Sequence, residues 1–281
     1  DRFGLLESIR IYAAEKLTEA GELEESERRH LRHYTDLTRR ADAGLRGPDQ
    51  RAWLCRMDTE HVNLPQALDT ALSHGDGAQA VELTLGTFWH QWVTGRMSHV
   101  RADLAAAVAL PGPRGDRFAR ANALSVALGV HEHPERAEEQ VDRALSLFGA
   151  RARVERAEVQ WFAGLNLFTA GLEGAGERHL SEAIGTLAEH GRDWSAAVAV
   201  CYRDWMRLSV RGTLPEGLPD GRSAREVLEG LGDDWGVAQS LSVEHLEAEV
   251  LGRYGRARTV AERALALCED LGLPTEVCWW R

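Results

Sequence analysis

Gly191-Arg192-Asp193-Trp194 returns 41 residues later as Gly232-Asp233-Asp234-Trp235. Each Gly-x-x-Trp follows a leucine-rich helix ending and opens a new run of apolar residues at helical spacing. A period of about 40 residues is typical of a supersecondary unit that cannot bury its own apolar face and must stack on a neighbouring copy. The repeat therefore predicts an all-α fold, built as an α-solenoid.

Weaker copies of the repeat extend the pattern in both directions. Upstream, residues 147–149 lead into Trp161, and downstream, residues 271–274 lead to Trp279. Apolar residues at three- and four-residue spacing predict helices elsewhere, with Gly- and Pro-rich turns between them. We expect residues 1–72 to form a helical linker region and residues 73–281 to form about five helical hairpins, the last one interrupted. Only residues 1–5 permit a strand by pattern.

The hairpin around residues 161–187 carries the clearest packing signal. Gly164 and Gly176 allow two helix backbones to approach closely, while Trp161 and Leu180 fill the space around them. This alternation of small and large residues resembles the tetratricopeptide (TPR) repeat, although the period exceeds the roughly 34 residues usual there. The resemblance implies TPR-like hairpins in a right-handed superhelix.

Bulk composition excludes several function classes. The net charge is −11, which disfavours nucleic acid, and the arginine-rich residues 28–40 are interleaved with acids, as on a solvated helix face. No apolar run approaches the roughly 20 residues of a membrane helix. The four cysteines are scattered, which favours free thiols in a reducing cytoplasm. The chain starts at Asp1 without a leader, and we expect this start to be a cut inside a longer bacterial protein.

Three segments carry a more specific resemblance. They read RFGLLESIRIYAAEKL (residues 2–17), GLRGPDQRAWL (residues 44–54) and EHVNLPQAL (residues 60–68). These resemble the region that follows the winged helix in AfsR-like and SARP-type bacterial transcription regulators, and the similarity covers about residues 2–110. In that family a DNA-binding module, a STAND (NB-ARC-type) ATPase and a winged helix precede a C-terminal TPR array. The resemblance implies that this chain is the arm that restrains the ATPase or receives an activating signal.

Catalytic and metal motifs are weak. No Gly-x-x-x-x-Gly-Lys-Ser/Thr phosphate loop occurs, and Lys16, the single lysine, falls inside a predicted helix. Residues 131–133 (His-Glu-His) and the pair His30 and His33 lack a third metal ligand nearby, so a loop and a helix face are the favoured readings. We expect no enzyme activity, no cofactor and no metal.

Polar and aromatic residues on the first helices of the hairpins are candidates for a groove on the concave face. The set comprises Trp161, Asn166, Tyr202, Arg203, Trp205 and His245. Arginine and aromatic residues are enriched at recognition hot spots. The alternative is ordinary core or surface, and the recurrence of Trp161 with the repeat favours packing for that residue.

Two functions remain open from the sequence. The first is a non-catalytic regulatory arm of a bacterial activator of secondary metabolism, acting by protein–protein contact or by autoinhibition of an upstream ATPase and DNA-binding module. The alternative is a small-molecule effector sensor of the same kind of regulator, for which a narrow pocket with an aromatic lining is expected. We expect no direct nucleic-acid contact and no membrane contact, and Trp279 and Trp280 favour end-to-end association of copies.

Overall fold

The computed structural model describes residues 7–112 and 114–281. These residues are all-helical, with 15 helices, no strand, and 78% of the chain in helix. Neighbouring helices along the chain pack against one another. The predicted all-α fold is therefore confirmed, and the strand that residues 1–5 permit lies outside the described residues.

Four helices form the N-terminal part: α1 (Glu7–Ala20), α2 (Leu23–Gly44), α3 (Gln50–Thr59) and α4 (Asn63–Ser73). The long helix α2 packs against both α4 and α5. At the α2–α5 crossing, Gly86 lies so close to Thr38 that a Cβ there would stand 2.5 Å from the threonine Oγ1. The predicted linker region is therefore packed onto the following helices, and its boundary at residue 72 stays a prediction.

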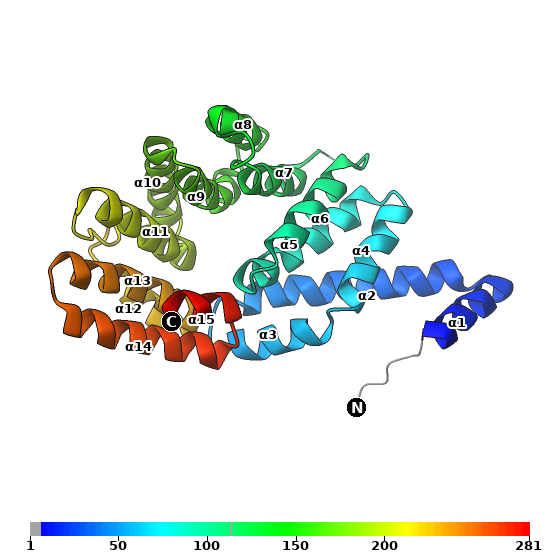
Figure 1. Ribbon diagram of the computed structural model, residues 1–281. Helices are drawn as coiled ribbons and strands as arrows, with labels where there is room; N and C mark the ends of the chain where they lie inside the picture. Colours follow the sequence, from blue (N-terminus) through cyan, green and yellow to red (C-terminus); the bar gives the residue numbers. More distant parts are fainter. Residues whose placement is uncertain (1–6, 113) are drawn as a thin grey trace.

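Eleven further helices follow in the described chain, mostly as pairs joined by short turns (Figure 1). They are α5 (Gly77–Val93), α6 (Met97–Ala109), α7 (Asp116–Leu128), α8 (Pro134–Leu145), α9 (Arg153–Thr169), α10 (Glu173–Glu189), α11 (Asp193–Arg211), α12 (Ala224–Leu231), α13 (Asp234–Val250), α14 (Tyr254–Leu271) and α15 (Pro274–Trp280). The first helices of the successive pairs are α5, α7, α9, α11 and α13.

The repeated glycines end one helix so that the next can begin. Gly191 and Gly232 both adopt left-handed backbone conformations, with φ of 63° and 67°. Side chains other than glycine rarely adopt this conformation without strain, which explains the glycine of each Gly-x-x-Trp. Asp233 then caps the N-terminus of α13, as its position predicts. Asn63 stands directly before the helical pattern of apolar side chains in residues 64–72, a position from which we predict that it caps the helix there. This prediction is wrong, because α4 begins at Asn63 itself and the Asn63 amide donates to Glu60.

The predicted close approach within one hairpin is confirmed for α9 and α10. A Cβ on Gly164 would lie 2.9 Å from the Gly176 carbonyl oxygen, and a Cβ on Gly176 would lie 2.8 Å from the Gly164 carbonyl oxygen. Leu180 packs directly over Gly164. The two helix backbones therefore touch with no side chain between them at this point.

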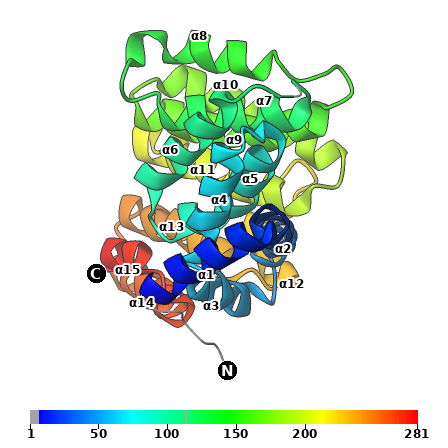
Figure 2. The same ribbon diagram turned by 90° about the vertical axis from the view of Figure 1, so that its right-hand side faces the viewer.

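The chain curves until its C-terminal helices meet the N-terminal part. In Figure 1, α14 returns beside α3, and these two helices are in contact. The turn after α5 also reaches α15, because a Cβ on Gly95 would clash with Thr275. Figure 2 shows α8 at the end of the molecule opposite to α3 and α14. The helices thus close into a ring in which the N-terminal part lies against the C-terminal part.

Tryptophans from four helices meet inside this ring. Trp89 of α5 lies edge to face against Trp161, Trp194 and Trp235, at ring-centroid distances of 6.4, 5.0 and 4.8 Å. Trp89 and Trp235 are almost fully buried, and Trp161 is buried as well. Such aromatic pairs contribute roughly 0.5–1.5 kcal/mol each beyond their burial. The repeated tryptophans are therefore packing residues, as their recurrence predicts.

A buried histidine makes stability pH-dependent at the contact between α3 and α5. His90 is 1% exposed, and its Nε2 lies 3.2 Å from Asp58 Oδ1, which also binds Arg96. Burial lowers the pKa of His90 to about 4, against the opposing attraction of Asp58. Because the pKa in the unfolded chain is about 6.5, the unfolded state binds a proton at a higher pH than the folded state does. The contribution of His90 to stability is therefore fully present above pH 6.5 and is lost progressively as pH falls toward 4.

We therefore expect the unfolding free energy to fall between pH 6.5 and 4 by up to about 3 kcal/mol from this residue alone. His90→Gln, which keeps a donor for Asp58, should flatten this part of the profile. Urea unfolding at several pH values measures both chains, and His179, whose pKa burial also lowers, remains in each. Identical pH profiles for the two chains would contradict the expectation.

Candidate functional site

Three cavities are relevant here, because one is lined by two of the sequence-predicted residues, Tyr202 and Trp205, and another by the unpaired Arg120. One is a cleft beside α15, one lies under the loop after α11, and one lies where α9 and α11 begin. Their volumes are about 200, 290 and 480 Å³, respectively. Only the last two approach or fall within the roughly 300–1,000 Å³ typical of small-molecule sites.

The cleft beside α15 brings several predicted residues together. Tyr202 and Trp205 line it from α11, opposite Trp279 and Trp280 of α15. Trp161 lies behind, with its ring parallel to that of Tyr202 at a centroid distance of 6.0 Å. His245 is adjacent, with its ring 5.7 Å from that of Trp280. The helix α15 therefore covers the face on which these residues were expected to form an open groove.

Burial at this cleft changes the pKa of a carboxyl group on α15. Glu276 lines the cleft, and burial raises the pKa of Glu276, while the nearby Trp235 and Gln239 oppose this rise. Trp279 also lines the cleft, but 69% of its surface is exposed. The C-terminal helix thus presents one face to the first helices of the array and one aromatic side chain to solvent.

The other two predicted residues have partners inside the chain. Asn166 is buried, and its amide donates to the Phe162 carbonyl oxygen at 2.9 Å. Arg203 is 7% exposed, and it donates to Asp204 Oδ1 at 2.9 and 2.8 Å and to the Gly217 carbonyl oxygen at 3.0 Å. The structure does not bring these two side chains to the α15 cleft.

Asp204 and Arg203 together hold the loop of residues 212–223. Asp204 Oδ2 accepts hydrogen bonds from the backbone N–H groups of Glu216 and Gly217, each at 3.2 Å. The carboxylate is therefore bonded through both oxygens. A buried ion pair with its remaining hydrogen bonds satisfied can be retained without leaving a free charge. Arg203 therefore holds the loop of residues 212–223 against α11. Helical spacing in the sequence does not indicate this role.

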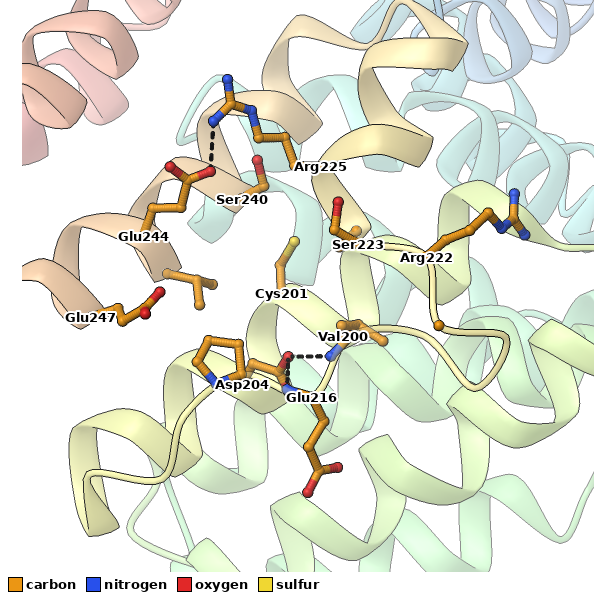
Figure 3. A pocket seen from close by; sticks show the side chains of 15 residues that line it. Val200, Cys201, Asp204, Glu216, Arg222, Ser223, Arg225, Ser240, Glu244 and Glu247 are labelled. Carbon is orange, nitrogen blue, oxygen red and sulfur yellow. Dashed lines mark hydrogen bonds and ion pairs between the residues drawn. The ribbon is translucent and has the colours of Figure 1, made fainter.

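The loop roofs the second cavity, which Figure 3 shows from close by. Cys201 points into it from α11, with Ser223 and Ser240 nearby (Figure 3). Burial raises the pKa of the Cys201 thiol far above its usual range, so the reactive thiolate is suppressed. Glu244 at the rim is already bound by Arg225 at 2.7 Å. The described lining offers no activated nucleophile.

The third cavity, the seam cavity, lies between the N-terminal part and the array. It is lined by the end of α2, by one side chain of α7, by the first turns of α9 and α11 and by the end of α12: Asp42, Arg46, Arg120, Val154, Glu155, Glu158, Gly191, Arg192, Asp193, Trp194, Ser195 and Leu231. Sequence reasoning missed this site, although four of its residues, 191–194, form the first Gly-x-x-Trp of the repeat. No pattern in the sequence brings Arg46 and Arg120, which lie 74 residues apart, next to that repeat. A further sequence signal is that Arg46 belongs to the segment GLRGPDQRAWL.

The charges of the seam cavity are mostly paired. The ion pairs are Asp42–Arg46 at 2.8 Å, Glu158–Arg192 at 2.9 Å and Asp193–Arg222 at 3.1 Å. Arg120 is different, because it makes no hydrogen bond or ion pair with any residue that the structure describes, and its Nε is buried without a partner. Burial lowers the pKa of Arg120, and the nearby Asp42 and Glu158 only partly oppose this.

A hydrogen-bonded contact, the closure seam, adjoins this cavity and joins residues far apart in sequence. Gln50 at the start of α3 donates from Nε2 to Asp233 Oδ1 at 3.2 Å and accepts from the Trp235 backbone N–H at 3.0 Å. Asp233 Oδ2 accepts from Trp194 Nε1. The Arg46 guanidinium lies over the rings of Trp89 and Trp194, 5.3 and 4.9 Å from their centroids. These residues define the closure seam.

Other site classes gain no support among the described residues. No group of three or more metal-ligating side chains occurs there, and Glu132, a weak metal candidate, is bound by Arg101. None of the described helices combines the length and apolar character needed to cross a membrane. Compared with known proteins, the chain matches no family model, and no curated protein is detectably similar to it.

Proposed function

We propose that this chain is the non-catalytic C-terminal arm of a bacterial transcription activator of the AfsR-like or SARP type. In this proposal residues 73–281 are a right-handed TPR-like array, and residues 1–72 join it to an upstream winged helix and ATPase in the cytoplasm. The resemblance of residues 2–17, 44–54 and 60–68 supports this assignment. The 41-residue return of Gly-x-x-Trp supports a repeat array.

Between the two regulatory readings, the geometry favours the small-molecule sensor. The observation that carries this choice is the seam cavity, because its walls come both from α2 and from the starts of α9 and α11. A molecule bound there contacts both parts of the ring, so it binds the closed ring more tightly than an opened one. A ligand shifts a conformational equilibrium only through such differential affinity. The open groove expected for a protein segment is instead covered by α15.

The test is thermal unfolding of the purified chain with two fractions of a cell extract, one of small molecules and one of macromolecules. A ligand at about 100 times its dissociation constant adds roughly 2.7 kcal/mol of stability. We expect the small-molecule fraction to raise the melting temperature and the macromolecular fraction to leave it unchanged. No shift with small molecules would contradict the sensor proposal.

Direct contact with the upstream module is a second candidate function, and α1 favours it. Ile9, Ile11 and Tyr12 on this helix are 47, 51 and 59% exposed. Neighbouring apolar side chains left exposed on one helix mark an interaction surface. The resemblance places this helix directly after the winged helix. A stabilising shift with the separately purified upstream module, abolished by Ile11→Ser, would favour this candidate.

A further inference from the structure

The geometry points to the seam cavity as a binding site for a small oxyanion, a carboxylate or phosphate group held by Arg120. This inference deepens the proposed function, on which it rests for its physiological meaning. It names the chemistry that the sensor would recognise. The observations are an unpaired guanidinium, two uncapped helix starts in the same wall, and a cavity of about 480 Å³.

Among the described residues that line the cavity, Arg120 is the one cation without an acidic partner. The other two lining arginines, Arg46 and Arg192, already bind acidic groups. Of the lining acids, only Glu155 has no cationic partner among the described residues, and it is exposed to solvent. Arg120 is half-buried and its Nε is fully buried, and a charge left unpaired in such a place is unfavourable. A carboxylate or a phosphate could accept two hydrogen bonds from one guanidinium and reduce that penalty.

The helix starts add further donors to the same wall. Val154 lies in the first turn of α9 and Ser195 in the first turn of α11, and both line the cavity. Neither helix has a side-chain cap at its N-terminus, whereas Asp76, Ser223 and Asp233 cap α5, α12 and α13. The first backbone N–H groups of a helix have no partner within the helix, and its dipole favours an anion there.

The tryptophans beside the cavity supply a direct signal for binding. Trp194 lines the cavity and has the Arg46 guanidinium over its ring. An anion next to Arg120 changes the electrostatic field at this guanidinium and at the indole. Binding is therefore expected to change tryptophan fluorescence independently of any thermal shift.

The experiment titrates the full chain with inorganic phosphate, with acetate and with benzoate, using chloride at matched ionic strength as the reference. We expect at least one of the three probes to change tryptophan fluorescence saturably, with a dissociation constant of about 1 mM or tighter. Phosphate alone would identify a phosphate-bearing ligand, and acetate or benzoate alone a carboxylate. The absence of any saturable change beyond that of chloride would overturn the inference.

Variants assign the effect to Arg120. Arg120→Gln should weaken binding at least about tenfold, because a charge-assisted hydrogen bond is lost. Arg120→Lys should give an intermediate loss, because the charge remains without the planar fork. Arg117→Gln is the matched control on the same helix, since Arg117 binds Glu82 and does not line the seam cavity. Equal affinity of the wild type and Arg120→Gln for the probe would overturn the inference.

The stability of the free variant separates a binding role from a structural one. Because Arg120 has no partner among the described residues, Arg120→Gln should melt at the same temperature as the wild type or higher. A large decrease would mean that Arg120 supports the fold instead. The extract experiment keeps the two proposals distinct. If small molecules stabilise the wild type and Arg120→Gln equally, the sensor proposal stands and the oxyanion site fails. If the probes bind but the extract fractions cause no shift in melting temperature, the oxyanion site stands and the sensor proposal fails.

Discussion

Replacing Gly176 with alanine is expected to lower the unfolding free energy by about 3 kcal/mol, because overpacking of a tight contact typically costs 1–3 kcal/mol and here the obstacle is backbone. The new methyl group would lie 2.8 Å from the Gly164 carbonyl oxygen, 2.9 Å from Phe168 Cβ and 3.0 Å from the Phe168 backbone nitrogen. None of these atoms moves with a change of side-chain rotamer. The α9–α10 pair would have to separate, and it makes the largest helix–helix contact in the described chain.

Two other glycines on α10 provide matched controls. A Cβ on Gly174 or on Gly185 meets no neighbouring atom within 4 Å. Alanine is a better helix former than glycine by roughly 0.5–1 kcal/mol, so these two replacements should stabilise the chain. Urea unfolding followed by both circular dichroism and tryptophan fluorescence measures all three variants. If Gly176→Ala also stabilised the chain, the close approach of α9 and α10 would be refuted.

The same hairpin shows what sequence alone can predict. Gly164 and Gly176 predict a close approach of two helices because both lie at helical spacing among large apolar residues. This contact lies within one hairpin, so predicting it requires no knowledge of the rest of the fold. The left-handed Gly191 and Gly232 likewise follow from local chemistry. Helix existence, helix ends and contacts between adjacent helices were therefore predictable. The predicted cap at Asn63 was wrong because α4 begins one residue earlier than the sequence indicated.

The candidate site was harder to predict from the sequence, because helical periodicity indicates which face of a helix is buried but not which distant helix covers that face. Tyr202 and Trp205 do share a cleft, but α15 forms its other wall. The sequence favoured Arg203 as a recognition residue because arginine is common at hot spots. In the structure its guanidinium is instead paired with the neighbouring Asp204 carboxylate. The seam cavity depends on the accumulated curvature of every helix pair between α2 and α12. Arg120 belongs to no sequence motif, and its lack of a partner among the described residues is visible only in the folded structure.

Closure of the ring depends most on one carboxylate, and Asp233→Ala is expected to lower the unfolding free energy by about 3 kcal/mol. Loss of a helix cap typically costs about 1 kcal/mol. In addition, the half-buried Trp194 indole N–H loses its acceptor, and the buried Gln50 amide keeps only the Leu45 carbonyl oxygen as acceptor. An unsatisfied buried group costs roughly 1–3 kcal/mol. Burial raises the pKa of Asp233, so part of this loss is offset by removal of a buried charge.

The control for the cap itself is Asp76→Ala. Asp76 caps α5 by accepting from the Gln79 backbone N–H at 3.0 Å, but it is exposed and takes no part in the closure seam. Its loss should cost about 1 kcal/mol. Equal losses for Asp76→Ala and Asp233→Ala in urea unfolding would mean that the closure seam adds nothing beyond an ordinary helix cap.

A double-mutant cycle then isolates the bond across the ring. Gln50→Ala removes the partner of Asp233 and of the Trp235 backbone N–H without touching the α13 cap. If these groups form one network, the double variant should lose less than the sum of the single losses, by roughly 0.5–3 kcal/mol. Additive losses would place Gln50 and Asp233 in independent roles. Coupling would make the ring a cooperative unit, and a ligand in the adjoining cavity could then act on residues 1–72 by stabilising the contacts that hold the two ends together.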